Sequence, residues 1–473
     1  MTDQLVETGR IVLVPRHISA GALLPQPEHH KRRVAQIAAI IPAYNEEAHI
    51  ARAIASLLEQ TRVPDVIHVV VNNSSDNTFW VAKESEGTKI MSYRGVDYAT
   101  EVIVHDMGAN PDKKVGALNY GYSWAAGADL VLGMDADVVA HKRAVEQLEA
   151  EILSDSRIGG ISAIYSIDAS AFHGVGSKWL VAGQNAQFAA FNMANLLRNR
   201  QMAVLGGQLS IFRVEAIERV MERFNQQTPY VRDSEVEDSY LSLQIKAVGF
   251  QTKISASARA FVGGMPTVRA LHSQQLKWVA GTAKLMMQHP FHPNLRLRWF
   301  ETVSMAFNIA SRLGFLALLA ASLSSHMYAF NPVWLVPPVV AWMLNIRTTA
   351  TMKHRTAADW VYSVLFIPAE IYMVLRIIHF VVAWWQVLGK GEHDYWADQA
   401  RSESGTGGSA GILWPAFSFL LVSAFVVFTW LHLQASLQSA ILEVAWPMLS
   451  VVTVLLTVTM LRKLLQRHRG FRA

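Results

Sequence analysis

Two aspartates follow a strongly apolar stretch near the middle of the sequence. Residues 130–139 read LVLGMDADVV, so Asp135 and Asp137 come directly after a segment that is suited to burial. A buried carboxylate without a partner is strongly unfavourable. In an extended segment, side chains i and i+2 point the same way, which predicts that the two carboxylates face one ligand. Such oxygen ligands suit Mg²⁺ or Mn²⁺ completed by substrate phosphates, although a solvated turn after the strand is the alternative.

The residues around this motif predict the elements that would position it. Apolar runs with the length of strands alternate with segments of helical periodicity through residues 34–290. The predicted strands include VAQIAAIIP (34–42), DVIHVVV (65–71), TEVIVH (100–105) and DLVLGM (129–134). This alternation predicts an α/β fold with a mostly parallel sheet that is covered on both faces. Ligands of such sheets bind beyond the carboxyl ends of the strands, where the D-A-D motif lies.

The composition indicates a membrane protein with a substantial soluble part. Apolar residues make up 51% of the 473 residues and charged residues only 17%, against about a quarter in soluble proteins. Residues 462–473 carry five Lys or Arg and no acid directly after an apolar run, which favours a membrane-surface anchor over nucleic-acid binding. The chain has no cysteine, which excludes disulfides and thiolate metal sites.

Long apolar runs dominate the sequence after about residue 300. A fifth run, 360–388, differs from the others because it contains Glu370, Arg376 and His379. If this run lies at the cytoplasmic interface, every basic loop and the basic tail fall on the cytoplasmic side, as the positive-inside rule requires. We therefore expect an interface helix at 360–388, a cytoplasmic loop at 389–410, and four transmembrane helices at about 303–330, 331–346, 411–433 and 440–462.

These observations predict three regions. Residues 1–35 form an N-terminal lead without the features of a signal peptide, so we expect the domain that follows to be cytoplasmic. Residues 36–290 form the α/β domain, with interface helices at its C-terminal end, and residues 291–473 form the membrane domain. The expected location is a cell inner membrane or plasma membrane, with several membrane passes.

Further motifs follow the predicted strands in a fixed order. They are IIPAYNEEAHI (40–50), VVVNNSSDNTFW (69–80), KKVGALNYG (113–121), LGGQLSIFR (205–213), VEDSYLSLQIKAVGF (236–250) and HSQQLKW (272–278). Together with D-A-D, this pattern resembles the family 2 glycosyltransferases of GT-A fold, especially the membrane-embedded synthases of hyaluronan, chitin and cellulose. The resemblance covers about residues 36–290 and extends to the membrane layout. It implies a Rossmann-like GT-A domain followed by an α-helical transmembrane domain.

The resemblance implies roles for individual residues. The nucleotide-sugar site would comprise Pro42, Ala43, Tyr44, Asn45, Glu46, Asn72, Asp76, Lys114, Asp135 and Lys277. Asp137, with Asp135 beside it, would hold Mg²⁺ or Mn²⁺, and Asp238 would be the general base, preceded by Glu237. The acceptor would contact Gln274, Trp278 and Gly207. A purely structural role is the alternative for Glu237 and Asp238, because acidic residues are favoured at the start of a helix.

The sequence also departs from the family pattern. An Asn72–Asn73 pair stands where the family has an aspartate, and Lys277 replaces the arginine of Q-x-x-R-W. Lysine keeps the positive charge but loses the bidentate fork. Residues 389–401 resemble the family's W-x-x-x-x-R loop, and an unspecialised loop is the alternative. Arg312 either lines a path through the membrane half or precedes the first span.

The resemblance implies an inverting, metal-dependent transferase of a UDP-sugar, such as UDP-GlcNAc or another UDP-hexose. Its partners would be this donor, a glycan or lipid acceptor and the lipid bilayer, without nucleic acid; the sequence leaves a homo-oligomer open. Two alternatives remain. One is a single-addition transferase that acts on a lipid or protein acceptor. The other is a non-catalytic membrane scaffold or transport subunit with a decayed transferase domain.

Overall fold

A computed structural model describes residues 35–93, 96–232, 236–328, 331–389, 398, 401 and 413–473. Residues Met1–Ala35 separate from Gln36–Ala473, and the fold below is that of the second unit. The predicted lead and most of the loop that resembles W-x-x-x-x-R lie outside the described residues.

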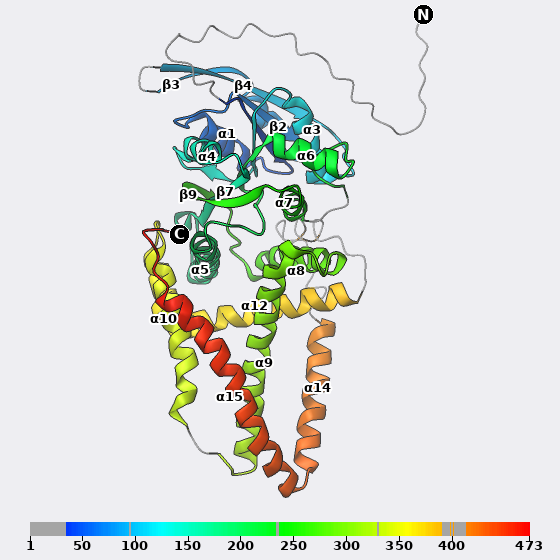
Figure 1. Cartoon of the computed structure of the whole chain (residues 1–473), viewed down its shortest axis with the longest axis vertical. Coiled ribbons are helices and arrows are strands. Elements are labelled where there is room, and N and C mark those ends of the chain that lie inside the picture. The colour runs from blue at the N-terminus through cyan, green and yellow to red at the C-terminus, as the bar shows by residue number, and fades with distance from the viewer. Residues whose placement is uncertain are drawn as a thin grey trace, which may run out of the picture. The chain divides into compact units, whose positions relative to one another are not determined.

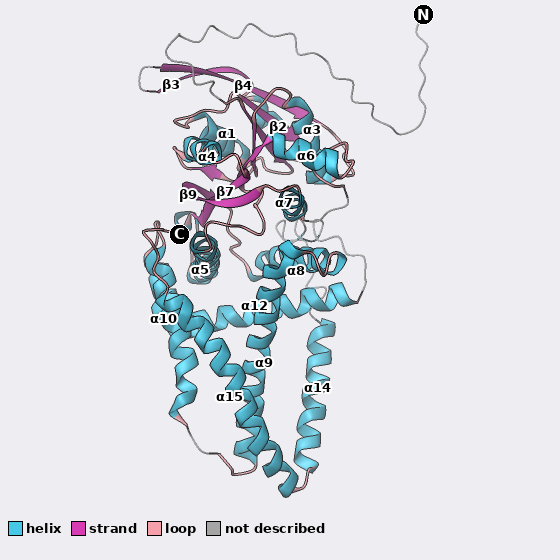
Figure 2. Ribbon diagram, in the orientation of Figure 1, coloured by secondary structure: helices cyan, strands magenta, loops and turns pink. Residues whose placement is uncertain are grey.

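A nine-stranded mixed sheet forms the core of the α/β region, in the order β3-β4-β2-β1-β5-β8-β7-β9-β6. Figure 2 shows its strands in magenta among the helices of this region. Strands β4, β2, β1 and β5 are parallel neighbours, whereas β3, β8 and β6 pair with their neighbours only in the antiparallel sense. The strands are β1 (Ile37–Ala43), β2 (Val66–Val71), β3 (Gly87–Tyr93), β4 (Val96–Asp106), β5 (Leu130–Met134), β6 (Val139–Ala140), β7 (Ile158–Ile167), β8 (Leu209–Arg213) and β9 (Gln251–Val262). The expectation of a mostly parallel sheet was therefore wrong. Its parallel centre is correct, because buried parallel strands are the ones that read as continuous apolar runs.

Helices surround this sheet and then form the remainder of the described chain (Figure 1). In the α/β region they are α1 (Ile50–Leu58), α2 (Thr78–Lys83), α3 (Lys113–Trp124), α4 (Ala144–Leu153), α5 (Val175–Leu197), α6 (Val214–Arg223), α7 (Glu237–Ala247) and α8 (Val268–Gln288). They are followed by α9 (Arg296–Ser324), α10 (Val336–Thr351), α11 (Ala357–Val364), α12 (Phe366–Leu388), α14 (Leu413–His432) and α15 (Ala435–Leu465). Single 3₁₀ turns occur at Ala169–Ala171, Pro293–Leu295 and Pro332–Leu335.

Three helical segments of the described chain are long and apolar enough to cross a membrane. They are Pro293–Ser324, Phe366–Leu388 and Ala435–Leu465, and a shorter apolar helix covers Phe417–His432. Figure 1 shows α12 lying crosswise to α9, α10 and α14. Its buried residues include Ala369, Tyr372 and Ala383, whereas Ile367 and Ile371 on another face are exposed.

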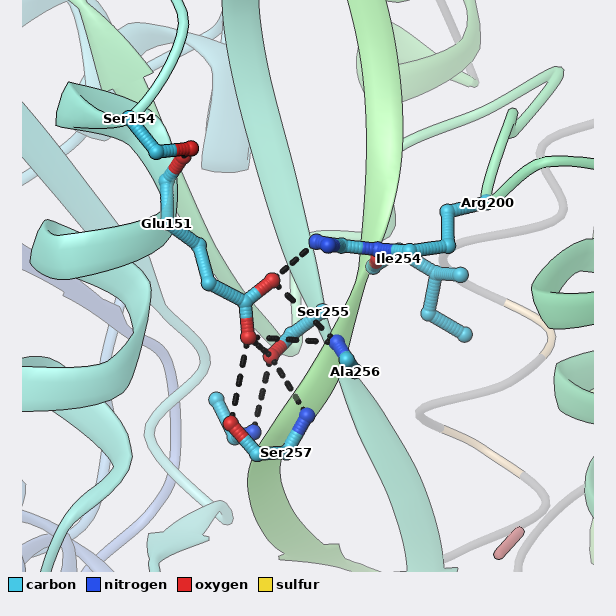
Figure 3. Close-up of polar contacts among 8 residues, drawn as sticks. Glu151, Ser154, Arg200, Ile254, Ser255, Ala256 and Ser257 are labelled. Carbon is cyan, nitrogen blue, oxygen red and sulfur yellow. Dashed lines mark hydrogen bonds and ion pairs between the residues drawn. The ribbon is translucent and has the colours of Figure 1, made fainter. Parts of the chain in front are cut away.

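A carboxylate from α4 holds an irregular segment of β9 (Figure 3). The pairing of β9 with β7 shifts register within residues 254–259. The Glu151 carboxylate accepts hydrogen bonds from the Ser255 hydroxyl at 2.7 Å and from the Ala256 amide at 3.2 Å, and it pairs with Arg200. This network satisfies backbone and hydroxyl groups that leave the regular ladder, and it fixes the strand that leads to the cavity described below.

Replacing Glu151 by Ala should lower the free energy of unfolding by about 1–3 kcal/mol, because the substitution leaves buried hydrogen-bond donors without an acceptor and the Arg200 charge without this carboxylate. The midpoint of thermal unfolding in detergent measures this loss. Glu222→Ala, which removes an exposed carboxylate from α6, is the matched control. Equal midpoints for the two variants would show that the network does not stabilise β9.

Candidate active site

A cavity of about 2100 Å³ lies at the carboxyl ends of the central strands and extends between helices of the C-terminal half. It is lined by nearly all the residues to which the sequence assigned chemistry. Two exceptions are Asp76 and Gly207, which do not line it. The motifs that are separated in sequence by more than two hundred residues therefore meet in one space.

The segment after β1 forms one lip of the cavity. The side-chain oxygen of Asn45 accepts a hydrogen bond from the backbone amide of Ser75 at 2.8 Å. The backbone amide of Asn45 donates a hydrogen bond to the Ser74 hydroxyl at 3.0 Å. The Glu46 amide donates to the Thr78 hydroxyl at 2.7 Å. Asn45 has a left-handed backbone conformation (φ 52°), which asparagine tolerates better than most residues. These bonds join the loops that follow β1 and β2.

The residues after β2 have two different roles: some line the cavity, and others form hydrogen bonds that hold its lip. Asn72 is buried and lines the cavity. Asp76 instead accepts hydrogen bonds from the Thr78 amide at 3.0 Å and from the Glu47 amide at 3.2 Å. Burial opposes the shift, but hydrogen bonds from the Thr78 hydroxyl and from these two amides lower the pKa of Asp76. Asp76 therefore braces the lip of the cavity and is not among the residues that line it, and its contact with the nucleotide stays a prediction.

The D-A-D motif forms a turn and not an extended segment. The Val138 amide donates to the Asp135 carbonyl at 3.2 Å, and the Asp135 amide donates to the Gln208 carbonyl at 3.3 Å. The premise of alternating side chains was therefore wrong for these residues. Both aspartates still line the cavity, because a turn at a strand end can also direct neighbouring side chains to one side.

Lys114 lies among three carboxylates. Its ammonium group is 2.7 Å from Asp135 Oδ1 and 3.1 Å from Glu237 Oε1. Burial alone would lower the pKa of Lys114, but Asp135, Glu237 and Asp238 hold it well above its ordinary value. Lys114 is therefore charged, and it connects the D-A-D turn to the start of α7.

Asp238 is held by the backbone of the loop before β8. Its Oδ2 accepts a hydrogen bond from the Gly207 amide at 2.7 Å. A Cβ at position 207 would stand 2.8 Å from both Asp238 Oδ2 and Lys114 Nζ, so a larger residue there would displace these two side chains. Burial and the neighbouring Glu237 raise the pKa of Asp238, while Lys114 opposes the rise. Gly207 thus lies beside Asp238 and Lys114 and is not among the residues that line the cavity, and its contact with an acceptor stays a prediction.

Asp137 lies against Gly263 at the end of β9. A Cβ at position 263 would collide with its Oδ2, so Gly263 leaves room for this carboxylate. Burial, followed by the charges of Asp135 and Glu46, raises the pKa of Asp137 to about 7. No group of three or more His, Asp or Glu converges as a complete metal cage in the described part of the chain. The donor set fits a hard divalent cation that keeps positions for phosphate or water.

Sequence reasoning missed His49, which also lines the cavity. Its Nδ1 is 2.9 Å from Glu46 Oε2. This hydrogen bond raises the pKa of His49 against the effect of burial, and Asp137 adds to the rise. The i,i+3 spacing of Glu46 and His49 was a usable signal, because such neighbours meet on a helical turn.

Helix α8 contributes the Q-x-x-K-W residues to the cavity. Gln274 and Lys277 are buried, and Trp278 packs with its ring centre 6.2 Å from that of Phe188. Gln275 accepts a hydrogen bond from Gln187, which in turn accepts one from the Tyr372 hydroxyl.

Comparison with known proteins identifies the class. The model described as glycosyl transferase family 2 matches residues 38–221, and that of glycosyl transferase family group 2 matches residues 130–388. The second match spans more than half of the chain. The chain therefore belongs to the family 2 glycosyltransferases, which confirms the resemblance in its motifs and the GT-A-like fold.

Individual relatives are more distant. An N-acetylglucosaminyltransferase of Rhizobium meliloti (strain 1021) is 22% identical over 376 residues, which cover 77% of this chain and 83% of that protein. A hyaluronan synthase of Streptococcus pyogenes is 28% identical over 211 residues, covering 44% of this chain and 47% of that protein. A mannosyltransferase, PcManGT from Pyrobaculum calidifontis, solved in complex with GDP-Man and Mn²⁺, has a TM-score of 0.46 and 17% identity, covering 76% of this chain and 88% of that one.

Proposed function

We propose that this glycosyltransferase is an inverting, metal-dependent enzyme that transfers a sugar from a UDP-sugar to a membrane-associated acceptor, extending a glycan or glycosylating a lipid. The observation that carries the proposal is the convergence of Asp137, Lys114 and Asp238 in one cavity. A carboxylate suited to a cation, a buried cation and a carboxyl group of raised pKa are the groups that this reaction needs.

The lip residues Pro42–Glu46 and Asn72 would hold the nucleotide, with Lys114 and Lys277 beside the diphosphate. Asp238 would take the proton of an acceptor hydroxyl. At the same time the oxygen of that hydroxyl bonds to the anomeric carbon of the donor sugar, and the bond between that carbon and UDP breaks. A single displacement inverts that carbon. The rise in the pKa of Asp238 makes the carboxylate a stronger base. Gln274 and Trp278 would orient the acceptor.

Asp137 is the residue that would hold Mg²⁺ or Mn²⁺, with Asp135 next to it. The bound ion would offset the negative charge that develops on the departing diphosphate. The role of the protein is to keep Asp137 in place through Gly263 and to balance Asp135 with Lys114.

The first sugar to test is N-acetylglucosamine, because one relative is named an N-acetylglucosaminyltransferase. The purified protein should be offered a panel of UDP- and GDP-sugars with Mg²⁺ or Mn²⁺. Release of UDP supports the proposal, and product size separates glycan extension from a single addition. If neither UDP nor GDP is released from any donor of the panel, the result would instead favour a non-catalytic scaffold with a decayed transferase domain.

We also propose four membrane spans, close to α9, α10, α14 and α15, with α12 as a cytoplasmic interface helix. The exposed apolar face of α12 and its crosswise orientation support this arrangement (Figure 1). The multi-pass arrangement would place the catalytic domain in the cytoplasm.

Single cysteines test this topology in a chain that has none of its own. Arg401→Cys and Gln466→Cys should be protected from impermeant thiol reagents in intact cells, because both positions lie on the cytoplasmic side. Gln434→Cys, between α14 and α15, should react and serves as the positive control. Labelling of either cytoplasmic position from outside would contradict the four-span arrangement.

A further inference from the structure

The cavity changes character between its two ends. Around the D-A-D turn its charged side chains are mainly carboxylates, whereas arginines line the part that is enclosed by α9 and α12. Two of these arginines have carboxylate partners: Arg298 is 2.9 Å from Glu301, and Arg312 forms a bidentate pair with Glu370. These pairs balance their own charge and leave little attraction for a charged ligand.

Arg376 of α12 differs from them. It lines the same cavity but makes no hydrogen bond or ion pair with any residue that the structure describes. Its cavity-facing neighbours along the helix include Met373 and Phe380, which are apolar. An ionisable residue in such an apolar helix is unfavourable unless something pairs with it, and it therefore indicates a functional site.

A second unused donor lies close by. Tyr362 of α11 is buried to 7% exposure and lines the cavity, and its hydroxyl makes no hydrogen bond to a described residue. The ring centre of Tyr362 is 6.0 Å from that of Tyr372, which precedes Arg376 by about one helical turn on α12, and all three residues line the cavity. A guanidinium fork and a phenol hydroxyl together match the oxygens of a phosphate group.

The surroundings favour a phosphate that belongs to a lipid. The exposed side of α12 presents Ile367, Ile371 and Val374, each at least half exposed, as a helix at a membrane surface would. The phosphate groups of lipids lie at this same level. In the interface arrangement proposed above, Arg376 lies on the cavity side of α12 at the depth of lipid headgroups, and Asp238 lines the same cavity.

We propose that Arg376 and Tyr362 bind the phosphate group of a lipid acceptor, and that the rest of its headgroup extends along the cavity toward Asp238. This inference rests on the proposed transferase function, because it names the class of acceptor for that reaction. It assigns the membrane end of the cavity to an anionic lipid and the strand end to the nucleotide donor.

Short-chain dihexanoyl phosphatidylglycerol is a suitable probe, since it carries a phosphate and free headgroup hydroxyls. Titration calorimetry of the full chain in a neutral detergent should show that it binds. Dihexanoylglycerol, which lacks the phosphate, and glycerol phosphate, which lacks the chains, should each bind at least tenfold more weakly. Equal binding of glycerol phosphate would overturn the lipid assignment in favour of a soluble phosphate. Tighter binding of glucuronate than of the lipid would point to a carboxylated glycan.

Variants locate the site. Arg376→Gln should weaken binding of the probe about tenfold to a hundredfold, as expected for loss of a charge-assisted pair. Tyr362→Phe should weaken it about threefold to tenfold, since one neutral donor is lost. Arg462→Gln makes the same substitution at an exposed position outside the cavity and should bind like the unmodified chain.

UDP release, measured on the same preparations, separates this inference from the proposed function. If the unmodified chain releases UDP but Arg376→Gln binds the probe normally, the lipid site is refuted and the transferase stands. If no donor is turned over while Arg376→Gln loses the probe, the transferase proposal fails and the phosphate site remains. Unfolding midpoints of the two variants should match that of Arg462→Gln, so that weakened binding is not a consequence of unfolding.

Discussion

Replacing Asp238 by Asn should lower sugar transfer by about 10²–10⁴-fold, the range that a positioned general base contributes. Asparagine keeps the size of the side chain and can still accept the hydrogen bond from the Gly207 amide. It removes the basicity that burial and Glu237 strengthen. The affinity for the UDP-sugar should be nearly unchanged, because the diphosphate would be held by the cation, Lys114 and Lys277.

The measurement combines donor affinity with the rate of transfer in the Asn variant. Asp106→Asn, at an exposed position outside the cavity, controls for the change of charge. Transfer near the rate of the unmodified chain would remove Asp238 from the mechanism. Loss of donor binding would instead make it part of the nucleotide site.

The central strands of the sheet could be predicted because their burial is recorded in short, local stretches of the sequence. Strands β1, β2 and β5 are buried on both faces, and continuous apolar runs report that directly. The hairpin of β3 and β4 was missed in part, because residues 87–93 are mixed in polarity and lie at the edge of the sheet. The antiparallel position of β8 depends on pairing with strands far away in sequence, which no local pattern records.

The candidate site shows the same division. The identities of Asp135, Asp137 and Asp238 could be predicted from motifs, and the structure places all three at one cavity. Their environments could not be predicted. The double pairing of Lys114 joins residues that are more than a hundred positions apart, and the support of Asp238 by Gly207 depends on a loop that carries no charge.

The membrane half adds a further example. In the sequence, Arg312 and Glu370 are isolated charges in two apolar runs, and the location of Arg312 remained open. The structure places Arg312 within α9 and pairs it with Glu370 of α12. Charges that are 58 positions apart can be matched only when the helix packing is known. Arg376, six residues beyond Glu370, looks similar in sequence but has no carboxylate partner among the residues that the structure describes.

Replacing Asp137 by Ala should abolish metal-dependent binding of the UDP-sugar, a loss of about 100-fold or more. Removal of an outer partner of a metal site already costs about 10–100-fold, and Asp137 is proposed as a direct ligand. The variant should remain folded. A carboxyl group whose pKa is raised by folding, here from 3.8 to about 7, opposes folding increasingly as the pH rises through that window. Above pH 7 its removal therefore costs no favourable charge interaction.

The pH dependence of cation binding gives an independent check on Asp137. The carboxyl group must lose its proton to bind a cation, and its pKa in the folded chain is about 7. Affinity of the unmodified chain for Mn²⁺ should therefore fall by about tenfold per pH unit below pH 7 and level off above it. Titration calorimetry of Mn²⁺ between pH 5.5 and pH 8.5, values set about 1.5 units either side of that pKa, measures this slope. Asp137→Ala should show neither the affinity nor the slope. Unchanged UDP-sugar binding by this variant in Mg²⁺ or Mn²⁺ would mean that the D-A-D turn is only a polar end of strand β5.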